Sequence, residues 1–175
     1  MLMSLFKPRP VRSAGRRLFS AAVAQARTPS LYADLGVPDT TEGRFELYSC
    51  HVYLVLERLK NQGPQAVETG QALFDAYTLS LDDALREMGV GDLSVGRKMR
   101  KLGEAFYGRV QSFEAALAAL PLRERLEALL SRTVYAEGGA EAAPRLAEYL
   151  IVQRAELAGQ ATERLLQGEV SWRAA

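Results

Sequence analysis

Seven prolines divide this chain into segments whose apolar residues recur every three or four positions. That spacing places apolar side chains on one face of an α-helix, and proline is tolerated only at the first turn of a helix or beyond its end. No stretch of six or more residues alternates convincingly between apolar and polar, and no Asn-Gly or Asp-Gly turn occurs. The pattern predicts an all-α fold, a single helical bundle of about six helices. The prolines that bound the segments are Pro8, Pro10, Pro29, Pro38, Pro64, Pro121 and Pro144.

We expect helices over about residues 13–27, 44–60, 64–88, 94–120, 122–137 and 144–167. Helix 44–60 carries apolar residues on most sides, so we expect it to be central. Helix 64–88 is expected to bury Val67 and Met88, among other apolar residues. Helix 94–120 has the clearest pattern, an apolar stripe with steps of three and four that ends before Pro121. The segment 28–43 is expected to be a loop.

A chain of 175 residues suits one domain with a full core. With 48% hydrophobic and 25% charged residues, its composition excludes the disordered and low-complexity classes. The single cysteine, Cys50, excludes an intrachain disulfide and a thiolate-rich metal site. The longest apolar runs are far shorter than the ~18 residues that a membrane span needs.

The charge is unevenly distributed. Residues 1–33 carry six basic and no acidic residues, whereas the rest of the chain carries 16 basic and 21 acidic ones. We therefore predict a basic amphipathic N-terminal arm over residues 1–28 and a helical domain over residues 29–175. A cationic arm suits a phosphate-bearing surface such as lipid headgroups or nucleic acid.

Three interpretations of the arm stand open. It has the arginine and serine content of a mitochondrial transit peptide, but arginine outnumbers lysine 18 to 4 along the whole chain. It has a twin arginine before a short apolar stretch, as in an export signal. We favour a retained amphipathic helix that lies on a membrane surface or on the body of the protein. Its candidate phosphate contacts are Arg9, Arg12, Arg16 and Arg17.

A second basic run lies early in helix 94–120 and comprises Arg97, Lys98, Arg100 and Lys101. Such a run is ordinarily a solvated face, and contact with the phosphates of a membrane or of RNA is the alternative. The chain has no convincing helix-turn-helix pattern and its body is net acidic, so DNA is not an expected partner.

The residues alone predict no assembled active site. Cys50 and His51 are adjacent, and on a helix their side chains diverge by ~100°, so they cannot form a thiolate–imidazole pair. His51 is expected at the edge of the core or in solvent. One histidine without a matching glutamate excludes a di-metal carboxylate bundle. A non-enzymatic interaction protein without a cofactor is therefore the prediction.

Two glycines, Gly103 and Gly108, interrupt helix 94–120, and each costs about 1 kcal/mol relative to alanine. A cost of this size indicates close packing of another helix, or of a bound segment, against this part of the helix.

Six strings along the chain resemble one protein family in order and in separation. They are ARTPSLY at residues 26–32, LGVPDT at 35–40, GRFE at 43–46, QALFD at 71–75, LREMGVGD at 85–92 and AFYGR at 105–109. The chain resembles the ubiquinol–cytochrome c chaperone family over about residues 21–120, and in particular its short alphaproteobacterial members. One departure is Ser80, where members carry an acidic residue two positions before Asp82.

The resemblance implies a non-enzymatic assembly factor of the cytochrome bc1 complex, ubiquinol–cytochrome c reductase. Its implied partner is newly made cytochrome b, met near the ribosomal exit tunnel and beside an anionic membrane. The implied location is the cytoplasm, peripheral to the inner membrane, in a bacterium, or the matrix side of the inner membrane in a mitochondrion.

The resemblance also selects candidate contacts with the client protein or a partner, and for these residues we favour an ion-paired structural role over direct contact with the client. One group lies in the loop and at the start of the next helix, and others lie along the two longest helices. The candidates are Gly36, Pro38, Asp39, Gly43, Arg44, Asp75, Asp82, Arg86, Glu87, Gly89, Gly91, Asp92, Gly103, Phe106, Tyr107, Gly108 and Arg109.

Arg44 stands at a helix start, where a cation opposes the helix dipole. It therefore needs a carboxylate partner, and the candidates are Asp39, Asp82, Glu87 and Asp92. The structural interpretation is one ion-paired network that fixes how the loop crosses helices 64–88 and 94–120.

Three other functions remain open at this point. A lipid- or quinone-binding bundle at the membrane surface would show an apolar cavity between helices 44–60, 64–88 and 94–120. A small enzyme would use Glu87 or Asp82 with Tyr107 in a polar pocket. A ribosome factor would join the basic run 97–101 with Arg109 in one RNA-contacting surface.

Overall fold

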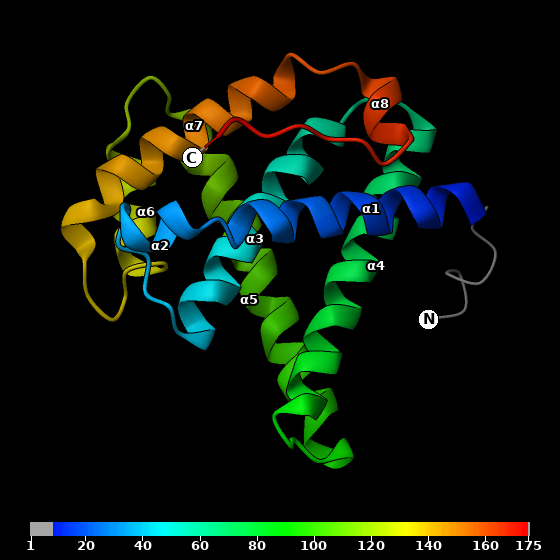
Figure 1. The fold of residues 1–175 in the computed structure, drawn as a ribbon, viewed down its shortest axis with the longest axis horizontal. Helices are drawn as coiled ribbons and strands as arrows, with labels where there is room; N and C mark the ends of the chain where they lie inside the picture. Colours follow the sequence, from blue (N-terminus) through cyan, green and yellow to red (C-terminus); the bar gives the residue numbers. More distant parts are fainter. Residues whose placement is uncertain (1–8, 175) are drawn as a thin grey trace.

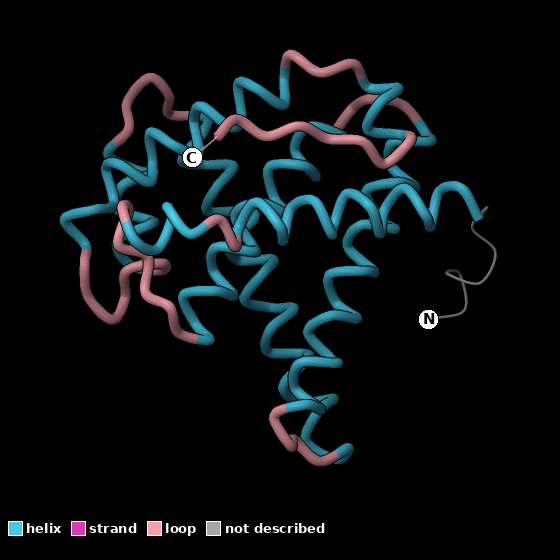
Figure 2. The backbone as a smooth tube through the Cα atoms, in the orientation of Figure 1, coloured by secondary structure: helices cyan, strands magenta, loops and turns pink. Residues whose placement is uncertain are grey.

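A computed structural model describes residues 9–174, with every side chain in that range except those of Arg9 and Leu93. The described part contains α-helices and one short 3-10 helix, η2, and no strand (Figure 2). Six of the helices have nine or more residues, which confirms the prediction of an all-α bundle of about six helices. The elements are α1 (Arg9–Ala26), α2 (Pro29–Ala33), α3 (Thr41–Leu59), α4 (Pro64–Glu87), α5 (Asp92–Ala118), α6 (Glu124–Arg132), η2 (Ala140–Ala142), α7 (Ala143–Ala158) and α8 (Thr162–Leu166).

Two predicted helix ends were wrong. The helix expected over 122–137 ends at Arg132, and the helix expected over 144–167 divides into α7 and α8. Arg58 of α3 caps the end of α7, because its guanidinium donates to the carbonyl oxygens of Leu157 (2.9 Å) and Gln160 (2.6 Å). These carbonyls at the end of α7 are thereby satisfied from another helix, and the chain is free to turn. The expected loop 28–43 also contains α2, which begins at Pro29.

Helix α3 forms the centre of the protein, as the sequence predicts, and α1 crosses it and α4 (Figure 1). The crossing of α1 and α4 is close. A Cβ atom added to Gly15 would lie 2.5 Å from the backbone carbonyl carbon of Ala72, so only glycine fits there. Helices α4 and α5 run side by side beyond the rest of the body to a short connection at residues 88–91, and we call them the α4–α5 hairpin.

The basic N-terminal helix packs on the body. Leu18 and Ala22 of α1 are fully buried, against α3, α4 and α8. Arg16 is exposed, and Arg17 donates to the backbone oxygen of Gln167. Two guanidinium nitrogens of Arg12 are buried without a hydrogen-bond partner in residues 9–174, and the side chain of Arg9 lies outside the described residues. The apolar face of this helix is therefore used within the protein.

The segment after α8 runs extended beside α1 (Figure 1), and the side chains of two glutamines hydrogen-bond to its backbone. The Gln153 side-chain amide donates to the backbone oxygen of Arg173 (2.8 Å) and accepts from its N–H (3.0 Å). Gln160 makes the same pair of bonds with Ser171, each of 2.8 Å. Between them Trp172 packs against all three hydrophobic clusters of the core. This segment is therefore part of the core structure.

His51 is fully buried, which corrects the expectation of an edge position. Its Nδ1 lies 2.8 Å from the carbonyl oxygen of Leu47, and its Nε2 lies 2.8 Å from the hydroxyl of Tyr149. Because a carbonyl oxygen only accepts, Nδ1 carries the proton and Nε2 accepts from Tyr149. The Gln25 amide donates to the same hydroxyl (2.9 Å). This chain of hydrogen bonds links α1, α7 and α3 and is complete only with neutral His51.

The buried imidazole predicts an acid-sensitive fold. Burial lowers the pKa of His51 to about 4 from its ordinary 6.5. Between these two pH values the unfolded chain binds a proton at this imidazole and the folded protein does not. The free energy of unfolding therefore falls as the pH falls, by about 3 kcal/mol in total. Urea unfolding of the wild type and of His51→Gln between pH 7 and 4 measures the effect. The stability difference between the two should shrink with acidification, and a constant difference would contradict a neutral buried His51.

Candidate functional site

The loop before α3 packs so closely against the first turn of α3 that only glycine fits at position 43. Thr40 caps α3 by accepting from the Gly43 N–H (3.1 Å). A Cβ atom added to Gly43 would lie 2.1 Å from the carbonyl oxygen of Pro38. Arg44 Nε lies 2.6 Å from Asp39 Oδ1, and this hydrogen bond holds the pKa of Asp39 below its ordinary value. Of the four predicted partners of Arg44, Asp39 is therefore the one it contacts.

The tip of the α4–α5 hairpin holds a second ion-paired junction. Arg86 Nε lies 2.6 Å from Asp82 Oδ2, and another nitrogen of the same guanidinium pairs with Asp92 at the start of α5. Gly89 follows α4 with a φ of +78°. Its N–H donates to the carbonyl oxygen of Arg86, and the N–H of Val90 donates to the carbonyl oxygen of Leu85, which together form a Schellman motif. The pairs of Arg44 and Arg86 are separate, so the expectation of one network was wrong.

Other predicted residues of this region have simpler positions. Glu87 is exposed near the tip. Gly91 has a φ of −64° and open space around it. This position therefore requires neither the conformational freedom nor the small size of glycine. Gly36 has a φ of +63° in the loop, and Asp75 accepts from the amide of Gln71 (2.8 Å).

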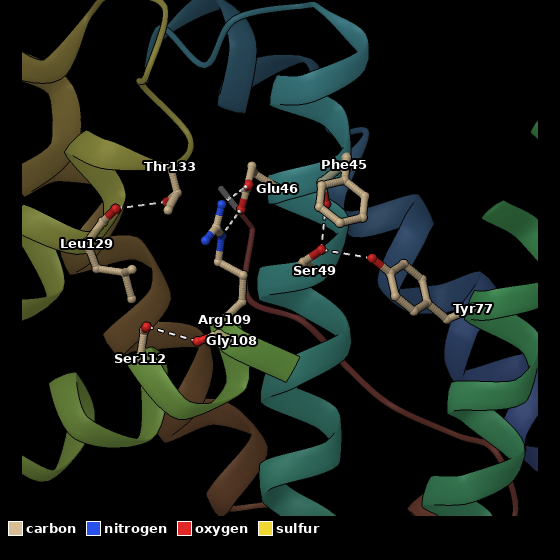
Figure 3. A network of polar contacts seen from close by, with 9 residues as sticks. All are labelled: Phe45, Glu46, Ser49, Tyr77, Gly108, Arg109, Ser112, Leu129 and Thr133. Atoms are coloured by element: carbon tan, nitrogen blue, oxygen red, sulfur yellow. Dashed lines mark hydrogen bonds and ion pairs between the residues drawn. The ribbon is translucent and has the colours of Figure 1, made fainter. Parts of the chain in front are cut away.

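A buried polar network ties α3 to both helices of the hairpin (Figure 3). The guanidinium of Arg109 on α5 donates to both carboxylate oxygens of Glu46 on α3, at 2.7 and 2.6 Å. The Glu46 side chain is only 11% exposed. On the other side of α3, the hydroxyls of Ser49 and Tyr77 lie 2.9 Å apart. Arg109 is therefore engaged within the protein, and its charge is satisfied by a single carboxylate.

Sequence reasoning left Glu46 and Ser49 out of the site. A usable signal exists for Glu46, because it occupies the same helical face as Cys50 and Tyr53, both buried. A carboxylate beside buried apolar positions of one helical face indicates a buried ion pair.

The middle of α5 presents a surface that nothing in residues 9–174 covers. Cβ atoms added to Gly103 and Gly108 would meet no atom within 4 Å, so the expected packing of another helix of this chain against them was wrong. Tyr107 is 65% exposed. Phe106 points inward, with its ring centroid 5.0 Å from that of Tyr77 and 5.3 Å from that of Phe74. Phe106 thus belongs to the core, whereas Tyr107 and the space beside each of the two glycines are open.

The hairpin exposes further apolar and basic side chains. Leu79 and Met88 of α4 are 61% and 57% exposed, so the prediction of a buried Met88 was wrong. Val67, also expected in the core, is exposed as well. The basic run of α5 is exposed at each of its four positions, Arg97, Lys98, Arg100 and Lys101.

The model of one protein family, ubiquinol–cytochrome C chaperone, matches residues 33–172 of the chain. The chain belongs to the ubiquinol–cytochrome c chaperone family. The match contains the loop junction, the whole α4–α5 hairpin and Trp172. It therefore extends beyond the 21–120 range of the sequence resemblance, through α6, α7 and α8.

A solved structure supports the same membership in the ubiquinol–cytochrome c chaperone family. The crystal structure of the Cbp3 homolog from Brucella abortus superposes with a TM-score of 0.85 and is 34% identical in sequence. The alignment covers 99% of this chain and 97% of that chain. No curated protein matches the chain. Among its described helices, none is both long and apolar enough to cross a bilayer.

Proposed function

We propose that this protein is a non-enzymatic assembly chaperone that binds newly made cytochrome b and assists assembly of the cytochrome bc1 complex. The observation that carries the proposal is the family match over residues 33–172, together with the whole-chain likeness to the Cbp3 homolog. The lone cysteine and histidine support a non-enzymatic role. Cys50 and His51 are both fully buried, and burial raises the pKa of the Cys50 thiol, so neither can act as a nucleophile or base.

In the proposal the client contacts exposed side chains and open glycine positions of the α4–α5 hairpin. Cytochrome b is a membrane protein, so its newly made segments are apolar helices. A helix surface with small residues lets another helix backbone approach closely. Gly103 and Gly108 offer that space on α5, and Tyr107 between them offers an exposed aromatic ring with a polar end. Leu79 and Met88 add exposed apolar side chains on the paired helix.

Exposed basic side chains support the proposal that this surface works beside a membrane. Arg97, Lys98, Arg100 and Lys101 lie on the same hairpin, and Arg16 adds an exposed cation on α1. Each basic residue near an anionic leaflet contributes about 1 kcal/mol of attraction. In the proposal the protein works at the inner membrane, from the cytoplasm of a bacterium or the mitochondrial matrix, close to the ribosomal exit tunnel.

Filling the open space beside Gly103 on α5 tests the proposal. Gly103→Leu places a side chain in open space, and leucine favours a helix over glycine by about 1 kcal/mol, so the fold should be retained or stabilised. We expect capture of cytochrome b, measured by crosslinking and pull-down during its synthesis, to fall at least about tenfold, which corresponds to 1.4 kcal/mol of lost contact.

Ala118→Leu is the matched control, because it adds the same side chain at an exposed position near the end of the same helix. It should capture cytochrome b like the wild type. Equal capture by Gly103→Leu would place the client elsewhere on the protein. Absence of cytochrome b from the wild-type pull-down, while it is being made, would overturn the proposed function.

A further inference from the structure

A pocket of about 420 Å³ opens between α3, α4 and α5. Its walls are mainly apolar and include Leu56, Leu59, Val67, Phe74 and Val110. Small-molecule sites in proteins occupy roughly 300–1,000 Å³ and are lined in this way. A helix of ~10 Å diameter fills about this volume with a single turn, so the pocket suits a small molecule better than a client helix.

One residue of the pocket wall, Tyr53, has a buried polar group that nothing in the described chain satisfies. Tyr53 is 3% exposed, and its hydroxyl is buried with no hydrogen-bond partner in residues 9–174. The ring is fixed by stacking on Phe113, with centroids 5.0 Å apart and planes at 17°. Burial raises the pKa of Tyr53, so the hydroxyl stays protonated and can donate. Buried hydroxyls in native proteins are nearly always paired, and an unpaired one points to a missing partner.

The rim of the pocket is charged. Lys60 and Glu114, which both line it, form an ion pair of 2.7 Å between the end of α3 and α5. Both side chains are about half exposed. The site thus combines apolar walls, one internal donor and a polar entrance, which is the pattern of a site for an amphiphile.

We infer that this pocket binds an apolar molecule that carries a hydrogen-bond-accepting oxygen, and that the Tyr53 hydroxyl donates to that oxygen. An acyl lipid with a carboxyl or ester group and a quinone with a carbonyl group both have this chemistry. The site lies within the described chain and needs no client, so the inference goes beyond the chaperone role and does not rest on it.

The experiment titrates the purified full chain, freed of lipid, with palmitate and separately with decylubiquinone, by calorimetry. Tyr53→Phe should bind the preferred probe about tenfold more weakly, because it removes one hydrogen bond in an apolar setting. Its urea unfolding midpoint should stay equal or rise, since the hydroxyl is unpaired in the free protein.

Val67→Glu places a charge in the apolar lining of the pocket and should abolish binding of the probe. Because Val67 is 66% exposed, the fold should tolerate the change. Ala84→Glu is the matched control, the same charge at an exposed position of the same helix outside the lining, and it should bind like the wild type.

Binding of palmitate alone identifies a lipid as the source of the oxygen, and binding of decylubiquinone alone identifies a quinone. Competition between the two supports one site for the shared chemistry. The inference is overturned if neither probe binds up to about 1 mM, or if Tyr53→Phe or Val67→Glu binds like the wild type. Cytochrome b capture by Val67→Glu, measured alongside, reports on the proposed function independently.

Discussion

Replacing Trp172 by alanine is expected to lower the free energy of unfolding by about 3 kcal/mol, the lower end of the cost of truncating a large core aromatic residue, because the indole is partly buried. The indole packs against each of the three hydrophobic clusters and lies edge-on to the His51 ring, with centroids 5.3 Å apart. Its loss would leave a cavity where α1, α3 and α8 meet.

Urea unfolding followed by circular dichroism measures this loss. Arg173→Ala is the matched control, because its exposed side chain is removed while its backbone still pairs with Gln153. The control should stay within about 0.5 kcal/mol of the wild type. A loss below about 1 kcal/mol for Trp172→Ala would mean that the segment after α8 lies on the core without stabilising it.

Replacing Arg109 by methionine is expected to cost about 3 kcal/mol or more, because it leaves the carboxylate of Glu46 buried and unpaired. The double variant Glu46→Leu with Arg109→Met removes both charges together. It should recover most of the lost stability, since a buried ion pair and a well-packed apolar pair of similar volume are of comparable stability.

The measurement is a double-mutant cycle by urea unfolding on the wild type, the two single variants and the double variant. Arg44→Met is the matched control, since the Arg44–Asp39 pair is mostly exposed, and its unfolding midpoint should not change measurably. Additive losses in the cycle would contradict a buried coupling between α3 and α5.

The long helices and the local ion pairs could be predicted because their determinants lie close together in the sequence. The prolines and the three–four spacing locate α3, α4 and α5 within a few residues. The partners Asp39 and Asp82 lie five and four residues from Arg44 and Arg86, within reach on one helix or its cap.

What the sequence missed depends on partners that are distant along the chain. His51 meets Tyr149 across 98 positions, Glu46 meets Arg109 across 63, and Arg58 caps α7 across 99. Helical periodicity says which face is apolar but not which helix covers it. For the same reason Gly103 and Gly108 indicate an unusual surface without telling whether this chain or another molecule fills it.

The position of Trp172 near the end of the chain has a consequence for synthesis. Helix α1 leaves the ribosome well before the residues that complete its surroundings, because those in α8 and beyond are about 150 positions later. At 5–20 residues per second they follow roughly 10–30 s after α1. During that interval the nascent polypeptide exposes the apolar face that α1 later buries. A translation product that stops short of residue 172 lacks Trp172 and would therefore leave that apolar face open to proteases.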